Sequence, residues 1–167
     1  MTDKNDLQRE VLSERYSYCP DTGIFTRMKS GHGKTAGEKA GTCTSNGYIF
    51  ISILRRQYLA HRLAWLWVHG HMPKFQIDHI NRIGTDNRIA NLREATGSQN
   101  ACNRAARAGS KSGVKGVHWQ PKVKRWRVAI CLNGKSKFYG YFDTINEARE
   151  VYRVAAEKTH GAFARTE

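Results

Sequence analysis

An aspartate and a histidine that are adjacent in the chain could form a hydrolytic site. Asp78 is followed directly by His79, then by Asn91 13 residues after Asp78, and by Asn100 nine residues further on. A carboxylate oxygen is a ligand for a hard cation, and a neutral imidazole can take a proton from water. One asparagine can hold the intervening loop, and the other can supply a second oxygen ligand from a neighbouring element. These residue types, in this order, indicate single-metal hydrolysis of a phosphodiester.

The chain is strongly basic. Its 167 residues include 28 Lys and Arg against 14 Asp and Glu, a formal charge of +14, and residues 101–167 hold 14 of the basic residues and only five of the acidic ones. Such an excess favours nucleic acid as a partner. An anionic membrane surface is the alternative, but no long basic amphipathic helix supports it. The length allows one domain or two small ones, and 40% hydrophobic residues suffice for small cores.

The cysteines are scattered at Cys19, Cys43, Cys102 and Cys131, and no CxxC pair is present. We therefore expect no structural zinc, and we favour free thiols in a reducing compartment over disulfides, which stay open. There is no apolar N-terminal signal, and the longest apolar cluster, at residues 63–68, is too short to span a bilayer. We expect an intracellular, soluble protein with no membrane partner and no small-molecule cofactor.

Local patterns place the candidate residues on elements in the first part of the chain. Residues 7–18 fit a short helix or an extended arm. Turn residues, β-branched runs and apolar periodicity predict further elements. In order, these are strands at 23–27 and 48–53, a helix at 61–69 ended by Gly70, a strand at 76–80, a polar loop at 81–91, a strand at 92–95, and a helix at 97–107 capped by Thr96 or Ser98. Asp78 and His79 then lie at the end of a strand, and Asn100 lies on a helix.

The composition changes at residues 103–113, which contain no large apolar side chain and read as a helix tail becoming a linker. Three β runs follow at 116–119, 125–132 and 135–142, and the last two are joined by Asn133-Gly134, a strong hairpin signal. An amphipathic helix is predicted at 146–160, with a Thr144–Glu147 capping box. Along 125–132, Trp126, Val128, Ile130 and Leu132 form a face suited to burial, opposite Arg125, Arg127, Ala129 and Cys131.

The segment from Asp78 to Asn100 resembles the HNH (His-Me finger) nuclease motif. The variant is the one in which Asp-His opens the motif and Asn replaces the final His, as is typical of phage and intron homing endonucleases. Residues 60–65 are similar to the segment that precedes the motif in those proteins. The resemblance covers roughly residues 16–104 and implies a β-β-α finger at about 76–107.

The resemblance also implies roles for the four residues. Asp78 would be a metal ligand, His79 the general base, Asn91 the brace of the loop and of the base, and Asn100 the second metal ligand. A carboxylate and an amide oxygen suit Mg²⁺ or Mn²⁺ and are poor zinc ligands. Weaker candidates for phosphate contacts are Arg62, Arg93 and His61, and structural roles for all three are left open.

Residues 112–165 resemble an APETALA2-type DNA-binding domain. The matching residues are Gly116-Val117, Trp126, Ala129-Ile130, Tyr139-Gly140-Tyr141-Phe142, Glu147-Ala148, Tyr152, Ala155-Ala156 and Gly161. Such domains are similar in laying a three-stranded antiparallel sheet in the major groove, with a helix behind it. The expected DNA contacts are Lys115, His118, Gln120, Lys122, Arg125, Arg127 and Lys137. Where plant domains carry Arg and Glu on the middle strand, this chain has Cys131 and Ala129, so their target sequence does not carry over.

Together these patterns predict an α+β fold. A β-rich N-terminal region leads into a ββα-metal HNH finger, and a three-stranded antiparallel sheet packed on one helix follows. The expected domains are a nuclease domain at 1–103, a basic linker at 104–113 and an APETALA2-type domain at 114–167. In the linker, Arg104, Arg107 and Lys111 are expected to follow the DNA backbone.

The sequence therefore favours a site-specific homing or HNH endonuclease that cuts double-stranded DNA with one divalent metal. Whether it nicks or makes a double-strand break is left open, and a monomer is favoured. The resemblance to phage proteins implies action in the cytoplasm of a bacterial host. The alternatives are a sequence-specific DNA-binding regulator with an inactive nuclease fold and an RNA-binding protein.

Overall fold

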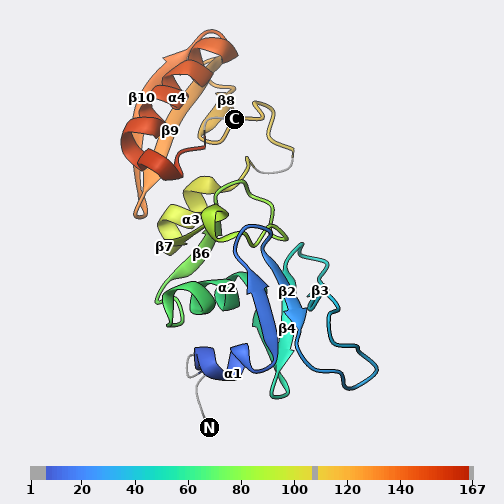
Figure 1. The fold of residues 1–167 in the computed structure, drawn as a ribbon. Helices are drawn as coiled ribbons and strands as arrows, with labels where there is room; N and C mark the ends of the chain where they lie inside the picture. The colour runs from blue at the N-terminus through green and yellow to red at the C-terminus, as the bar shows by residue number, and fades with distance from the viewer. Residues whose placement is uncertain (1–6, 107–108, 166–167) are drawn as a thin grey trace. The chain divides into compact units, whose positions relative to one another are not determined.

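A computed structural model describes residues 7–106 and 109–165 (Figure 1). The chain divides into two compact units, Met1–Ala95 and Thr96–Glu167. Both mix helices with small antiparallel sheets, so the predicted α+β class is confirmed. The domain boundaries expected at residues 103/104 and 113/114 stay a prediction. Within the described ranges, no helix is long and apolar enough to cross a bilayer.

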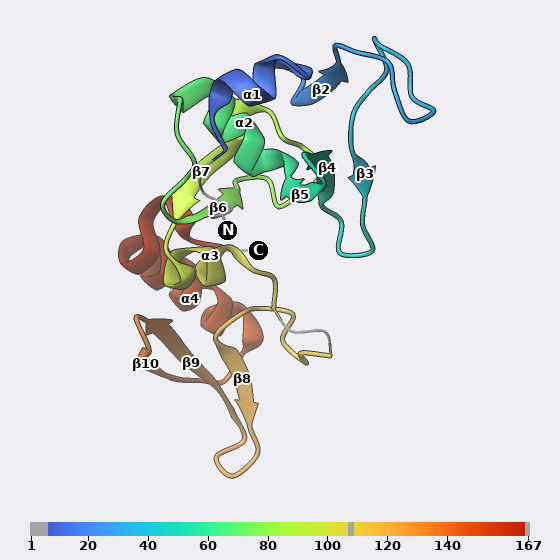
Figure 2. The same ribbon diagram turned by 90° about the horizontal axis from the view of Figure 1, so that it is seen from below.

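The first unit consists of short helices and strands. In chain order they are α1 (Arg9–Ser13), β1 (Tyr16–Cys19), β2 (Ile24–Arg27), β3 (Thr42–Cys43), β4 (Ile49–Ile53), β5 (Arg56–Leu59), α2 (Ala60–His69), β6 (Gln76–His79), the 3₁₀ turn η1 (Ile89–Asn91) and β7 (Leu92–Ala95). Antiparallel pairing joins β1 to β2, β3 through β4 to β5, and β6 to β7. The long connection between β2 and β3 stands out from the rest of this unit (Figure 2).

Helix α2 holds the core of the first unit together. Ala60, Leu63, Ala64 and Leu66 recur at helical spacing and are buried, and they share a core with side chains from α1 and all three sheets. The helix ends as predicted at Gly70, whose left-handed backbone (φ 78°) lets its N–H donate to the Leu66 carbonyl. The buried face of α2 therefore fixes the position of the strands around it.

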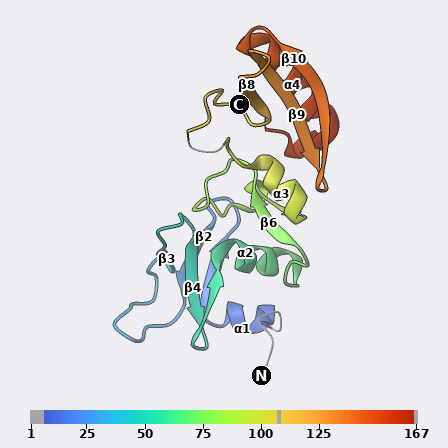
Figure 3. The same ribbon diagram turned by 180° about the vertical axis from the view of Figure 1, so that it is seen from behind.

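The second unit begins with a helix and ends with one. Its elements are α3 (Gly97–Asn103), β8 (Val117–Gln120), β9 (Arg125–Leu132), β10 (Lys135–Phe142), α4 (Ile145–His160) and the 3₁₀ turn η2 (Gly161–Phe163). Strand β9 lies between β8 and β10 in an antiparallel sheet, and α4 runs along one face of it (Figures 1 and 3). The core between them contains Val117, Val128, Ile130, Ala148 and Tyr152.

The helix caps and the hairpin follow the local sequence signals. Thr96, rather than Ser98, caps α3 through a capping box with Gln99, and Thr144 caps α4 through the box predicted with Glu147. Asn133 and Gly134 form the β9–β10 turn, both with positive φ.

Three local predictions need correction. Helix α3 ends at Asn103 instead of reaching residue 107, because Ala105 and Ala106 have little apolar surface to pack and the helix gains nothing by continuing. The sequence patterns missed the two-residue strand β3 and the strands β1 and β5, which are four residues each. Leu132, expected on the buried face, is exposed at the end of β9.

Candidate active site

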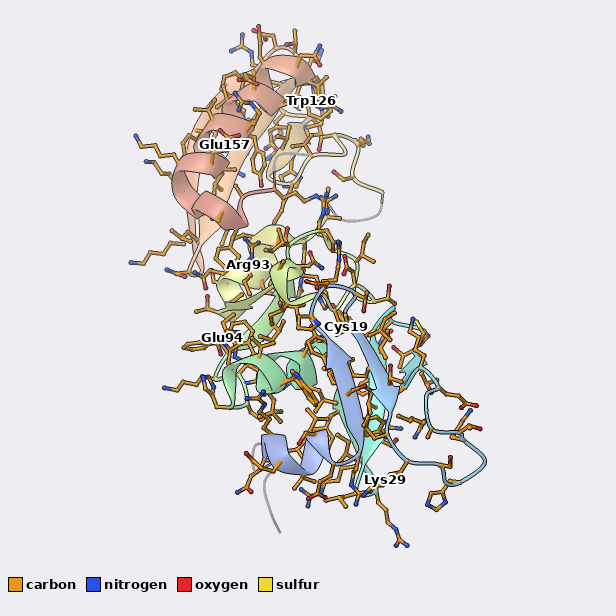
Figure 4. All side chains as sticks on the ribbon, in the orientation of Figure 1. Cys19, Lys29, Arg93, Glu94, Trp126 and Glu157 are labelled. Atoms are coloured by element: carbon orange, nitrogen blue, oxygen red, sulfur yellow. The ribbon has the colours of Figure 1, made fainter. Side chains whose placement is uncertain are left out.

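Asp78 and His79 lie at the end of β6, and both are about 95% buried. Asp78 pairs in register with Arg93 of β7, whose Nε and Nη2 donate to the same carboxylate oxygen at 2.8 and 2.7 Å. A buried carboxylate requires such a partner, because the charge would otherwise be too costly to desolvate. Arg93, which is labelled in Figure 4 and was expected to contact phosphate, thus has a structural role as the partner of Asp78.

The imidazole of His79 is held by Asn87. Nε2 of His79 lies 3.2 Å from Oδ1 of Asn87, which is an acceptor, so this contact keeps a proton on Nε2 and leaves the lone pair on Nδ1. Burial lowers the pKa of His79, against the opposing effects of the Asn87 hydrogen bond and the charges of Asp78 and Asp86. The ring is therefore neutral near pH 7, which is the state that a general base requires.

Asn87 was not among the predicted site residues, although it is almost completely buried. The hydroxyl of Tyr18, on β1, donates to its carbonyl at 2.7 Å, and its Nδ2 donates to the carbonyl of Thr85 at 3.4 Å. Burial raises the pKa of Tyr18, so this hydroxyl stays protonated and able to donate. The group that orients His79 is thus fixed by a strand 69 residues away in sequence.

Asn91 braces the loop between β6 and β7. Its Nδ2 donates to Oδ1 of Asn81 at 2.9 Å and to the Asp86 carbonyl at 2.8 Å, while its Oδ1 accepts from the Asn81 backbone N–H. Asp86 accepts from Asn81 and pairs with Arg88, whose hydrogen bonds lower the pKa of Asp86 to about 2. The bracing of the loop matches the predicted role of Asn91, while the contact with the imidazole comes from Asn87.

Two glycines let neighbouring turns pack against this loop. A Cβ on Gly84 would lie 2.5 Å from the Gly47 carbonyl oxygen, in the turn between β3 and β4. Gly23, in the β1–β2 turn, has φ 71° and packs on the backbone of Asn87 and Arg88. The loop that carries Asn87 is therefore clamped from two sides.

The aromatic rings of His61 and Tyr48 pack beside the imidazole of His79. His61, on α2, lies edge to face with His79, with ring centroids 5.0 Å apart and planes at 85°. Tyr48 lies 5.6 Å from His61 and 5.8 Å from His79, centroid to centroid. His61 is 5% exposed, its Nδ1 has no hydrogen-bond partner among the described residues, and burial lowers its pKa to about 3. His61 thus packs against the base instead of facing solvent, where it could contact phosphate.

The other predicted residues of this region occupy different places. Arg62 donates to the carbonyls of Phe75 and Pro73 at 3.3 and 3.2 Å, bracing the segment that enters β6. Asn100 lies on α3, in the second unit. Lys115 donates to the carbonyls of Ala101 and Cys102 at the end of the same helix. Arg104 and Lys111 are exposed, and Arg107 lies outside the described residues.

Four of the predicted DNA-contacting residues share one face of the second unit's sheet. His118 pairs in register with Arg127, and Gln120 with Arg125; His118 and Arg127 each follow or precede a buried valine, Val117 or Val128, and the strand alternation places all four on the face away from α4. Lys122 is exposed in the β8–β9 turn. Lys137 pairs with the buried Ile130 and so lies on the opposite face from these four.

The donors near β6 suit a hard cation. Asp78 offers a carboxylate oxygen, the kind of donor that Mg²⁺ and Mn²⁺ accept, whereas the imidazole beside it is a nitrogen donor that would also suit zinc. Among residues 7–106 and 109–165, no group of three or more His, Cys, Asp or Glu side chains is placed to hold a metal. A site here would therefore rely on one carboxylate, amide oxygens, and the substrate and water.

Comparison with known proteins gives the same segment a family. The HNH endonuclease family matches residues 58–102, from β5 into α3. Protein 3.8 of Escherichia phage T7 is 31% identical over 106 residues, which are 63% of this chain and 87% of that protein. The uncharacterized HNH endonuclease L560 of Acanthamoeba polyphaga mimivirus is 27% identical over 120 residues, 71% of this chain and 62% of that protein. No solved structure matches the chain.

Proposed function

Because the chain belongs to the same family as Protein 3.8 of Escherichia phage T7 and carries an HNH endonuclease domain at residues 58–102, we propose that it is a site-specific DNA endonuclease of the homing type. The family implies a nuclease with DNA as substrate. The observation that carries the finer proposal is the buried, neutral His79, oriented by Asn87 and adjacent to Asp78. The phage relative supports action in the cytoplasm of a bacterial host, and we favour a monomer.

His79 acts as the general base in this proposal. Nδ1 takes a proton from the water whose oxygen attacks phosphorus, and the bond from phosphorus to the leaving sugar oxygen breaks. Asn87 accepts a hydrogen bond from Nε2, so the second ring proton stays on that nitrogen and Nδ1 is the nitrogen that would act as the base. Asn91 keeps the loop that carries Asn87 in place.

Asp78 and Asn100 would hold one divalent cation, Mg²⁺ or Mn²⁺, together with phosphate oxygens and water. The cation supplies stabilisation of the negative charge that develops on the phosphate and the leaving oxygen. Arg93 balances the charge of Asp78 and so allows a carboxylate to remain buried there. The support for Asn100 is its spacing in the motif and its place on α3.

In this proposal the second unit recognises the DNA sequence of the target site. Phosphate contacts give affinity but carry no sequence information, so a separate surface must read the bases. The sheet face with His118, Gln120, Arg125 and Arg127 can enter a major groove, as proposed from the likeness to APETALA2-type domains. Arg104, Arg107 and Lys111 are proposed to follow the backbone.

Cleavage of a supercoiled plasmid that carries phage DNA tests the proposal. The full chain with Mg²⁺ should convert the plasmid to nicked or linear DNA, and EDTA should stop the reaction. His79→Ala should lose at least about 10²-fold in rate, the usual scale for a general base, while DNA affinity is unchanged. His71→Ala, which changes an exposed histidine, is the matched control. Full activity of His79→Ala would refute the assignment; DNA binding without any cleavage would indicate a regulator.

A further inference from the structure

Strand β10 carries two exposed aromatic side chains on the sheet face that points away from α4. Phe138 is 48% exposed and Tyr141 is 41% exposed. Phe138 pairs with Ala129 and Tyr141 with Arg127, which alternate along β9 with the buried Val128 and Ile130. The two rings lie 5.1 Å apart, centroid to centroid, and form one small apolar patch.

A β-bulge makes this patch possible. Residues three apart on a regular strand point to opposite faces, so Phe138 and Tyr141 would ordinarily be separated by the sheet. The register shifts between Phe138 and Gly140, and the extra residue returns Tyr141 to the face that Phe138 occupies. Gly140, with φ 130°, accommodates the irregular backbone. Exposing two aromatic rings in this way gains nothing for the core, which indicates a surface built for contact.

The charge around the patch complements DNA. The guanidinium of Arg127 lies 5.4 Å from the centre of the Phe138 ring, and His118 is the neighbour of Arg127 on β8. Arg is the commonest specific reader of guanine in the major groove, and apolar side chains there contact the methyl group of thymine. The small Ala129 beside Phe138 leaves room for a base edge.

Resting on the proposed DNA-binding role of this unit, we propose that Phe138 and Tyr141 contact thymine methyl groups in the major groove, beside a guanine read by Arg127. Stacking on unpaired bases fits less well. The two rings are inclined at 61° and offer no common platform, and Arg127 already covers a face of Phe138. The target site should therefore contain thymine within a base pair or two of a guanine.

Replacing thymine by deoxyuridine tests this, because it removes only the methyl group. A duplex is first selected from a randomised library by the full chain in EDTA, and each thymine is then replaced in turn. At one or two positions, deoxyuridine should weaken binding about threefold to fivefold, as expected for one buried methyl group. Phe138→Ala or Tyr141→Ala should weaken binding of the thymine duplex and abolish the discrimination at the corresponding position. Val154→Ala, which trims an exposed apolar side chain of α4, should keep it.

The outcomes separate the two proposals. Selection of a duplex with no methyl effect at any thymine, or discrimination retained in both aromatic variants, would overturn this inference alone. Tighter binding of single strands than of duplex would overturn it in favour of stacking. Failure to select any duplex would mean that the proposed DNA-reading role has failed, and the inference would fall with it.

Discussion

The buried imidazole of His61 should make the stability of the first unit depend on pH. Burial lowers its pKa to about 3 in the folded protein, whereas an unfolded chain gives histidine its ordinary pKa of about 6.5. Between these values the unfolded chain binds a proton that the folded protein excludes. The contribution of His61 to the free energy of unfolding is therefore constant above about pH 6.5. It is lost as the pH falls below that value, at about 1.4 kcal/mol per pH unit. Between pH 8 and pH 5 the loss is about 2 kcal/mol.

The substitution His61→Phe removes the site of protonation and keeps a flat ring beside His79. Two other effects accompany it. Removing an unpaired buried nitrogen should stabilise the protein by about 1–3 kcal/mol, and the larger ring can cost a similar amount. Neither effect depends on pH, so the change in slope isolates the titration. The variant should lose about 2 kcal/mol less than the wild type between pH 8 and pH 5.

Urea unfolding at several pH values measures this difference. Replacing Trp119 and Trp126 of the second unit by Phe in every protein compared leaves Trp65 and Trp67, both on α2, as the fluorescent reporters of the first unit. Linear extrapolation then gives the free energy of unfolding. His71→Phe, at an exposed position, should leave the pH dependence of the wild type unchanged. Parallel curves for the wild type and His61→Phe would show that His61 does not exclude a proton in the folded protein, and the account of its burial would be wrong.

Four further outcomes are expected. Asn87→Ala should lower the cleavage rate on the order of 10–100-fold, the scale for losing a group that orients an active-site imidazole, with an unchanged Kd for DNA; an unchanged rate would remove Asn87 from the site. Gly84→Ala should destabilise the first unit by about 1–3 kcal/mol in urea unfolding, since its Cβ meets the Gly47 carbonyl, whereas Gly31→Ala, with open space around it, should be nearly neutral. The cleavage rate should rise with pH as His79 loses its proton and, because burial lowers that pKa, should reach half of its maximum below the ordinary pKa of histidine; a midpoint well above that pKa would contradict the assignment. Replacing both Arg104 and Lys111 by Ala should reduce the salt dependence of DNA binding by up to about two charges, and an unaltered slope would mean that they face solvent in the complex.

Elements with strong local signals could be predicted from the sequence. Helix α2 has apolar residues at helical spacing and a glycine at its end, α4 has a complete capping box, and Asn133-Gly134 specifies a hairpin turn. Strands β1 and β5 have no such signal. Each is four residues long, and β5 runs directly into α2, so their pairing depends on the partner strands more than on their own composition.

The candidate site divides in the same way. The residue pattern predicted a strand at 76–80, close to β6, and the resemblance implied a bracing role for Asn91, whose side chain does hydrogen-bond across the loop. Asn87 could not be distinguished from its polar neighbours in the sequence. It differs from them in the hydrogen bond that Tyr18 donates to its backbone carbonyl and in its burial beside His79. The role of His61 likewise follows only from its packing against the ring of His79, which the sequence does not show. A buried asparagine in a polar loop is a signal only once burial is known.

Two ion pairs weaken the effect that neighbouring carboxylates have on the pKa of His79. Asp78 and Asp86 both attract a proton to the ring and would raise its pKa if their charges acted alone. Each is bound by an arginine, Asp78 by Arg93 at 2.7 Å and Asp86 by Arg88 at 2.6 Å, so the field that each carboxylate exerts on the imidazole is partly cancelled. Desolvation then remains the largest effect, and the ring stays neutral beside a carboxylate. A site can thus hold an acidic oxygen donor next to a base without protonating the base, provided that a cation also accompanies each carboxylate.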